Sequence, residues 1–226
     1  MQLTYFGHAC FAVDVDGTRL LFDPFIAPNP LASAIDVQAI AADYVLVSHG
    51  HGDHVADAAA IATRTGATLL SNFEIVQWFA GQGVPNGIGM NIGGNARLPF
   101  GTVKYVTAVH SSTLPDGTPG GNPGGFVVNG GGRTFYFAGD TALTYDMKLI
   151  ADEFTVDFAV LPIGDTFTMN AADAARAAEF VGTKTVVGVH YDTFPPIAID
   201  HEAARAAFAA RGITLLLPAI GETVTL

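Results

Sequence analysis

The sequence predicts an α/β fold with mixed β-sheets, and three observations support this prediction. Short apolar runs near the N-terminus are separated by tight turns, a pattern typical of β-hairpins. Longer alanine-rich segments indicate helices. Late in the chain, strand-like and helix-like segments alternate, which is the order found in units with parallel strands.

Three strand-like runs open the chain and indicate successive antiparallel strands. They occupy residues 2–6, 11–15 and 18–22. Asp16-Gly17 lies between the second and third runs, and this dipeptide favours a tight hairpin turn. A proline-containing loop over residues 24–36 follows.

Three alanine-rich segments predict helices, at residues 55–65, 171–180 and 201–211. Asn170 and Asp200 precede the second and third segments as N-cap residues, and Asp173 falls in the first turn of the second. Gly212 is placed to end the third. Further strands and a hairpin are expected near residues 184–189, 213–217 and 124–137.

A dense group of ligand-type side chains occupies residues 48–54, Ser-His-Gly-His-Gly-Asp-His. It follows Tyr44-Val45-Leu46-Val47, an apolar run that predicts a buried strand. The two glycines allow a sharp turn that can aim several side chains at one point. Imidazole and carboxylate together suit zinc and its first-row neighbours. The order His-x-His-x-Asp-His therefore predicts a metal site.

Three further apolar runs end at a histidine or an aspartate. His110 follows residues 102–109, Asp140 follows 135–138 after one glycine, and His190 follows 185–189. In a sheet covered by helices, polar groups at strand ends converge on one edge. These residues are therefore expected to complete the metal site.

In these motifs the sequence resembles the metallo-β-lactamase-fold hydrolases, whose five landmarks occur in order and cover nearly the whole chain. They are Asp23, the group His49/His51/Asp53/His54, His110, Asp140 and His190. A closer resemblance is to a branch of small metal-dependent hydrolases related to the ascorbate-6-phosphate lactonases. It is carried by residues 5–11, 22–25, 110–112, 121–126, 161–165 and 190–195. The resemblance implies a four-layer αββα sandwich with two mixed sheets.

The resemblance also implies two divalent metal ions. His49, His51 and His110 would hold the first ion, Asp53, His54 and His190 the second, and Asp140 would bridge them. Asp23 would sit behind these ligands and fix one of them or the backbone turn. Zinc is the expected metal, although donor atoms of nitrogen and oxygen alone also admit manganese, iron and nickel.

The expected reaction is hydrolysis by a water molecule that the metal pair activates. Asp53 has two interpretations, as a metal ligand first and as an acid or base for the leaving group. His8 follows Gly7 at the end of the first strand, where it could contact substrate, donate a proton or make a structural hydrogen bond. Ser48 and Ser111 adjoin ligands and are expected to orient them through hydrogen bonds.

The substrate is expected to be a small molecule with little charge. None of the ten lysines and arginines falls in the loops predicted around the site, whereas a phosphate pocket usually contains them. Several aromatic and aliphatic residues lie in those loops instead. An ester, lactone or amide therefore fits better than a sugar phosphate. Asn122 and Asp165 are candidate substrate contacts, although turn formation explains both almost as well.

Three alternatives stay open at this point. The first is a phosphodiesterase with the same metal ions. The second is a metal-dependent binding or sensing protein with little turnover, because ligands alone do not establish catalysis. The third is a redox enzyme, since this type of ligand set can also hold iron.

Composition limits the partners, the disulfide content and the cellular location that can be expected for the protein. The formal net charge of −11 argues against a nucleic-acid partner. The single cysteine, Cys10, excludes an internal disulfide and lies in an apolar run where a buried thiol is expected. No signal peptide or membrane span is recognised, so a cytoplasmic protein is expected. A homo-oligomer is compatible with the high apolar content. The candidate ligands span residues 49 to 190, which favours a single domain over residues 1–226.

Overall fold

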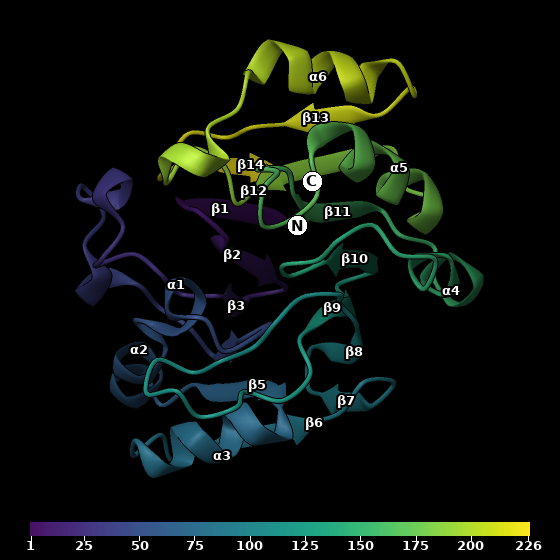
Figure 1. Ribbon diagram of the computed structural model, residues 1–226. Coiled ribbons are helices and arrows are strands. Elements are labelled where there is room, and N and C mark those ends of the chain that lie inside the picture. The colour runs from purple at the N-terminus through teal and green to yellow at the C-terminus, as the bar shows by residue number, and fades with distance from the viewer.

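Two mixed β-sheets of seven strands each pack face to face at the centre of the protein (Figure 1). The computed structural model describes residues 1–226. The first sheet has the order β14-β1-β2-β3-β4-β5-β6. Its strands are β1 (Gln2–Gly7), β2 (Cys10–Val15), β3 (Thr18–Phe22), β4 (Tyr44–Leu46), β5 (Thr68–Asn72), β6 (Gly87–Met90) and β14 (Thr223–Thr225).

The second sheet has the order β13-β12-β11-β10-β9-β8-β7. Its strands are β7 (Asn95–Leu98), β8 (Gly101–Thr107), β9 (Gly124–Gly130), β10 (Arg133–Phe137), β11 (Phe158–Pro162), β12 (Thr185–Val189) and β13 (Thr214–Leu216). Both sheets contain a run of four neighbouring parallel strands, β3 to β6 in the first and β10 to β13 in the second. The remaining pairs are antiparallel.

Helices cover the outer face of each sheet, so the molecule has four layers. One apolar core lies between the two sheets and contains phenylalanines from both, among them Phe22 and Phe135. A further core lies between each sheet and the helices that cover it. The first sheet carries α1 (Gly52–Val55), α2 (Ala58–Thr65) and α3 (Phe73–Gly81), and the second carries α4 (Met147–Glu153), α5 (Ala171–Val181) and α6 (His201–Ala209). This arrangement confirms the αββα sandwich.

Local sequence signals explain several element ends. Asp16 and Gly17 have φ angles of 50° and 83°, as the tight turn of the β2–β3 hairpin requires. The Asn170 side chain accepts a hydrogen bond from the backbone of Asp173 at the start of α5. The Asp200 side chain likewise accepts two backbone hydrogen bonds at the start of α6. Both predicted N-caps are confirmed.

Two predicted elements differ from the structure. The helix expected over residues 55–65 is divided into α1 and α2 at Asp57, whose carboxylate accepts backbone hydrogen bonds from Ile26 and Ala27. The strand expected over residues 102–109 ends at Thr107, two residues early. After Thr107 the backbone of Val109 bonds to the loop after β10, because its N–H donates to Thr141 Oγ1 and its carbonyl accepts from Ala142 N.

The candidate site lies where both sheets end. Asp23 follows β3 and the cluster of residues 48–54 follows β4, both in the first sheet. His110 follows β8, Asp140 follows β10 and His190 follows β12, all in the second sheet. The fold therefore brings the predicted ligands together from both halves of the sandwich, at the edge expected for parallel strands.

Candidate metal centre

The loop after β4 holds its polar side chains in a fixed array. His51 occupies the N-cap position of α1, and Asp53 and His54 lie within that short helix. Gly50 packs so closely against Leu114 that a Cβ atom there would come within 3.1 Å of its side chain. The glycine thus permits the close approach that the loop needs.

His49, His51 and His110 form a first group of possible metal ligands. One ligand atom from each lies within 4.8 Å of the others. His49 Nε2 and His51 Nδ1 are 3.0 Å apart. The far nitrogens of the same rings have hydrogen-bond partners, because Ser48 Oγ is 2.9 Å from His49 Nδ1 and Ser111 Oγ is 3.3 Å from His51 Nε2. The two serines therefore orient the rings, as expected.

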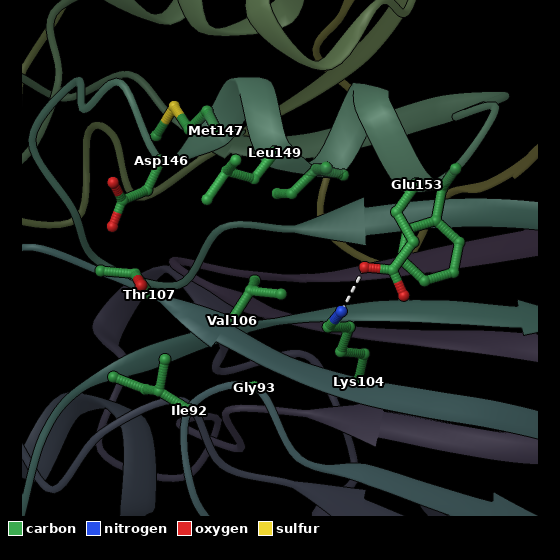
Figure 2. A pocket seen from close by; sticks show the side chains of 11 residues that line it. Ile92, Gly93, Lys104, Val106, Thr107, Asp146, Met147, Leu149 and Glu153 are labelled. Atoms are coloured by element: carbon green, nitrogen blue, oxygen red, sulfur yellow. Dashed lines mark hydrogen bonds and ion pairs between the residues drawn. The ribbon is translucent and has the colours of Figure 1, made fainter.

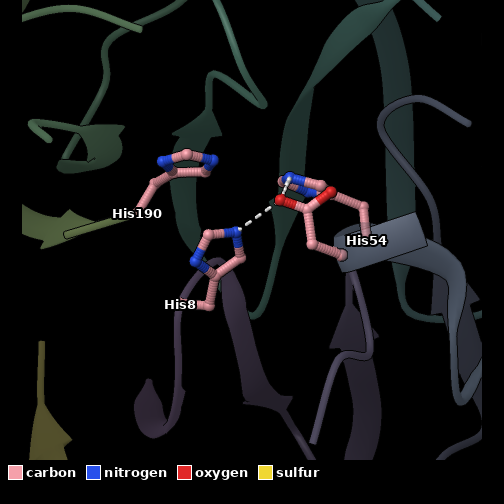
Figure 3. Close-up of side chains that lie close together, drawn as sticks. His8, His54 and His190 are labelled. Carbon is pink, nitrogen blue, oxygen red and sulfur yellow. Dashed lines mark hydrogen bonds and ion pairs between the residues drawn. The ribbon is translucent and has the colours of Figure 1, made fainter. Parts of the chain in front are cut away.

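Asp53, His54 and His190 form a second group, and His8 joins it. Figure 3 shows the rings of His8, His54 and His190 turned toward one another. His8 Nε2 lies 3.0 Å from Asp53 Oδ2, and His8 Nδ1 lies 3.0 Å from Thr193 Oγ1. Since a carboxylate only accepts, His8 Nε2 carries the hydrogen and Nδ1 accepts from the threonine. The structure thus places His8 in direct contact with Asp53.

Asp140 stands between the two groups. Its Oδ2 atom lies 3.0 Å from His190 Nε2 and 3.3 Å from His54 Nε2, in the second group. The same oxygen lies 3.5 Å from His110 Nε2 and 3.8 Å from His49 Nε2, in the first group. One carboxylate oxygen therefore faces four imidazole nitrogens, two from each group.

Asp23 lies directly behind His54 and is fully buried. Its carboxylate accepts hydrogen bonds from the Ser48 backbone at 2.7 Å and the Ser48 hydroxyl at 2.6 Å. His54 Nδ1 approaches the same carboxylate at 2.8 Å, which turns its Nε2 atom toward Asp140. Asp23 is therefore placed both to orient His54 and to fix the backbone turn.

Burial and close charges shift the pKa values of the cluster in opposite directions. Burial lowers the pKa of His49, His51 and His110, and it lowers the pKa of His8 to about 4. Burial also acts to lower the pKa of His54, but Asp140 and Asp23 outweigh it and raise that pKa well above 6.5.

The two cavity carboxyls have pKa values below their ordinary range. Burial alone would raise both. The hydrogen bond from His8 and the charge of His54 lower the pKa of Asp53, and the charges of His190 and His54 lower the pKa of Asp140 well below 3.8. Both carboxylates are therefore ionised at neutral pH.

The donor atoms fit divalent metal ions. Two atoms of the cluster, His54 Nε2 and Asp140 Oδ1, are buried without a hydrogen-bond partner. Such orphaned atoms are rare in folded proteins and call for a missing partner. In a tetrahedral zinc site, ligand atoms lie roughly 3.3 Å from one another. The spacings of 3.0 to 3.8 Å around Asp140 Oδ2 match this value.

A cavity of about 300 Å³ opens onto the cluster. Its walls contain neither lysine nor arginine; the lining residues are His51, Asp53, His110, Ser111, Asp140, Phe167, His190 and Phe194. Asn122 and Asp165 do not line it, so their contact with substrate stays a prediction. The Asp165 carboxylate accepts a hydrogen bond from the backbone of Thr166, as a turn residue does.

A second cavity, of about 190 Å³, lies between β8 and α4 (Figure 2). Its walls are largely apolar, and an ion pair between Lys104 and Glu153 stands at one end. It contains no histidine and shares no lining residue with the metal cluster. It therefore does not contribute to the chemistry described above.

Sequence patterns did not reveal the partners of several site residues. Thr193, which bonds to His8, lies in a loop with no recognisable ligand spacing. Asp192 accepts hydrogen bonds from the backbone of Ile199 and from His201, so it braces its own loop. Cys10 is fully buried, as expected.

Comparison with known proteins relates the chain to a protein family. A family profile described as a beta-lactamase superfamily domain matches residues 2–190. A UPF0173 metal-dependent hydrolase of Flavobacterium johnsoniae is 50% identical over 226 residues, covering 100% of both chains. One from Methylacidiphilum infernorum is 49% identical with the same coverage.

Solved structures show the same fold. Igni18, described as a metallo hydrolase of Ignicoccus hospitalis, superimposes with a TM-score of 0.89 at 37% identity, covering 99% of this chain and 97% of that one. An isothiocyanate hydrolase from Delia radicum gut bacteria has a TM-score of 0.81 at 23% identity, covering 100% of this chain and 99% of that one, and shows the shared fold alone.

None of the helices here combines the length and hydropathy needed to cross a membrane. The chain belongs to the metallo-β-lactamase-fold superfamily and, within it, to the UPF0173 metal-dependent hydrolases.

Proposed function

We propose that the protein is a dinuclear metal hydrolase that cleaves a small ester, lactone or amide. The observation that carries this proposal is the position of Asp140 Oδ2, within 3.8 Å of four imidazole nitrogens from two separate groups. Seven ligating side chains exceed the needs of one tetrahedral ion and suit a pair with open positions. His49, His51 and His110 would hold one ion, Asp53, His54 and His190 the other, and Asp140 both.

When bound, the ions would lower the pKa of a water molecule and polarise the group under attack. The side chains around them then have distinct tasks. Ser48, Ser111 and Asp23 hold three of the rings at fixed angles, so that no reorientation is needed when substrate arrives. Together they make the site rigid.

Asp53 is proposed as a metal ligand that also acts as a general base and then as a general acid. Its side chain is 30% exposed toward the cavity, whereas that of Asp140 is only 3% exposed. Because its pKa lies below its ordinary value, Asp53 begins the reaction ionised and accepts a proton before it can pass one to a leaving group. His8, neutral at pH 7, holds Asp53 in place by donating from Nε2.

The walls of the cavity support a substrate with little charge. No lysine or arginine lines it to pair with the negative charge of a phosphodiester. Phe167 and Phe194 give it two apolar walls instead. We favour an ester, lactone or amide over a phosphodiester for this reason.

Elemental analysis of purified protein followed by a substrate screen tests the proposal. About two metal ions per chain are expected, with hydrolysis of simple lactones or carboxylic esters. Faster turnover of bis-p-nitrophenyl phosphate would favour the phosphodiesterase instead. Tight metal binding with no turnover on a broad panel would favour a binding or sensing protein.

Three further features complete the proposal. Zinc is the proposed metal, because nitrogen and oxygen donors in a tetrahedral spacing suit it. The chain is proposed to work as one domain, because each metal group draws on loops from both sheets. A cytoplasmic setting is proposed from the buried free thiol of Cys10 and the lack of any disulfide.

A further inference from the structure

An exposed phenylalanine stands at the rim of the cavity. The Phe167 side chain is 55% exposed, and it lines the cavity together with Phe194. Exposed phenylalanine is ordinary when it stands alone on a surface, but beside a polar cleft it supplies the apolar part of a binding site. Its position therefore calls for an explanation in terms of binding.

The backbone that carries Phe167 is held in a conformation that L-residues rarely adopt. Asp165 has a φ angle of 61° and Thr166 one of 52°, and a β-branched residue such as threonine is a genuine outlier there. Hydrogen bonds from Asp165 N to Met169 O at 3.1 Å and from Phe167 N to Asp165 O at 2.5 Å close the turn. Strain of this kind persists where the surroundings enforce it, and it gathers at ligand clamps.

A side-chain hydrogen bond joins this turn to the loop of the second phenylalanine. Thr166 Oγ1 donates to the carbonyl oxygen of Pro196 at 2.9 Å. Phe194 is held two residues earlier, where its ring packs edge-on against His8 at 5.6 Å and lies 6.4 Å from the ring of Phe25. The loop of Phe167 is thus joined to the loop of Phe194, and the ring of Phe194 lies against the histidine cluster.

We propose that Phe167 and Phe194 form an aromatic clamp that binds an uncharged apolar acyl group and selects substrates by its length. The inference rests on the proposed hydrolase function and names its substrate class. An anionic acyl group is disfavoured because the walls contain the carboxylates of Asp53 and Asp140 and no lysine or arginine. The cavity has a volume of about 300 Å³, which is at the lower end of the range for ligand pockets. This volume limits the acyl group to a few carbons.

The first test compares p-nitrophenyl acetate with p-nitrophenyl hexanoate on the metal-loaded protein. Phe167→Ala is expected to lower the ratio of kcat/KM for the hexanoate to kcat/KM for the acetate roughly tenfold. Phe167→Leu restores much of the preference, because it keeps an apolar side chain there. Phe73→Ala is the matched control, since Phe73 is 56% exposed on α3 and does not line the cavity.

The second test measures binding without turnover. Calorimetry on the metal-loaded protein compares acetohydroxamic acid with hexanohydroxamic acid. The longer acid is expected to bind roughly tenfold more tightly to the wild-type protein, and Phe167→Ala removes most of that ratio. Equal affinity of the two acids for the wild-type protein, or an unchanged ratio in Phe167→Ala, overturns the clamp. A chain-length ratio that depends on Phe167 without any ester hydrolysis leaves the clamp standing and contradicts the proposed reaction.

Discussion

Replacing Asp23 with asparagine tests how the protein prepares its metal site. The Asp23 carboxylate uses both oxygens, one for the Ser48 backbone and the other for the Ser48 hydroxyl and His54 Nδ1. An amide keeps one oxygen and turns a donor toward His54. To avoid two facing donors, the His54 ring must then carry its hydrogen on Nε2, the atom that faces Asp140.

The cost follows from the contacts that are lost. Two hydrogen bonds to a buried carboxylate are replaced by bonds from a neutral amide, so the metal-free protein is expected to lose about 2 kcal/mol of unfolding free energy. Because the remaining tautomer blocks Nε2, metal affinity should fall by about 10- to 100-fold. Urea unfolding of the chelator-treated protein gives the first quantity, and competition with a chromophoric chelator gives the second.

Asp57→Asn provides the matched control. Asp57 is also buried and lies near the same sheet edge, but one oxygen accepts both of its hydrogen bonds, from the backbone of Ile26 and Ala27. An amide oxygen can keep both bonds, and no histidine is involved. Metal affinity should change by less than about twofold. Equal losses of affinity in the two variants, or none in Asp23→Asn, would refute the tautomer argument.

Three other predictions concern the same cluster. His110→Ala or Asp140→Ala should abolish hydrolysis while the circular dichroism spectrum stays close to that of the wild type; wild-type turnover in either variant would contradict their roles. His8→Ala should lower kcat by about 10- to 100-fold, and His8→Gln, which keeps a donor toward Asp53, should recover part of it in steady-state assays. Since the pKa of His54 is raised well above 6.5, its ring is protonated at pH 7 before metal binds, so affinity should rise with pH through the neutral range. Calorimetry in buffers of different ionisation enthalpy should detect about one proton released from His54 per chain, and a pH-independent affinity would count against this.

Much of the fold could be predicted from the sequence, because its elements carry local signals. The hairpin at Asp16-Gly17, the caps at Asn170 and Asp200 and the strand at residues 185–189 agree with the structure. Strands β5, β6 and β7 were not anticipated, since four or five residues carry too little periodicity. Helix α3 depends on the Asn72 side chain, whose capping role emerges only after the preceding strand is placed.

The candidate ligands were visible because they follow strands, but their surroundings were not. Nothing in the spacing of His8 connects it with Asp53, 45 residues away, or with Thr193. The turn at Asp165 and Thr166 has no glycine at the positions with positive φ, so its shape depends on tertiary contacts. Packing between distant loops decides such features, and a linear pattern does not record it.

The ligands of each proposed ion come from loops of both sheets, and this has a consequence for folding. Bound ions would cross-link the two sheets, so that the sheets could not separate while the ions remain bound. At a free metal concentration of one hundred times the dissociation constant, one site would add about 2.7 kcal/mol to the unfolding free energy. Cells starved of metal would therefore hold a chain that is idle and also easier for proteases to open.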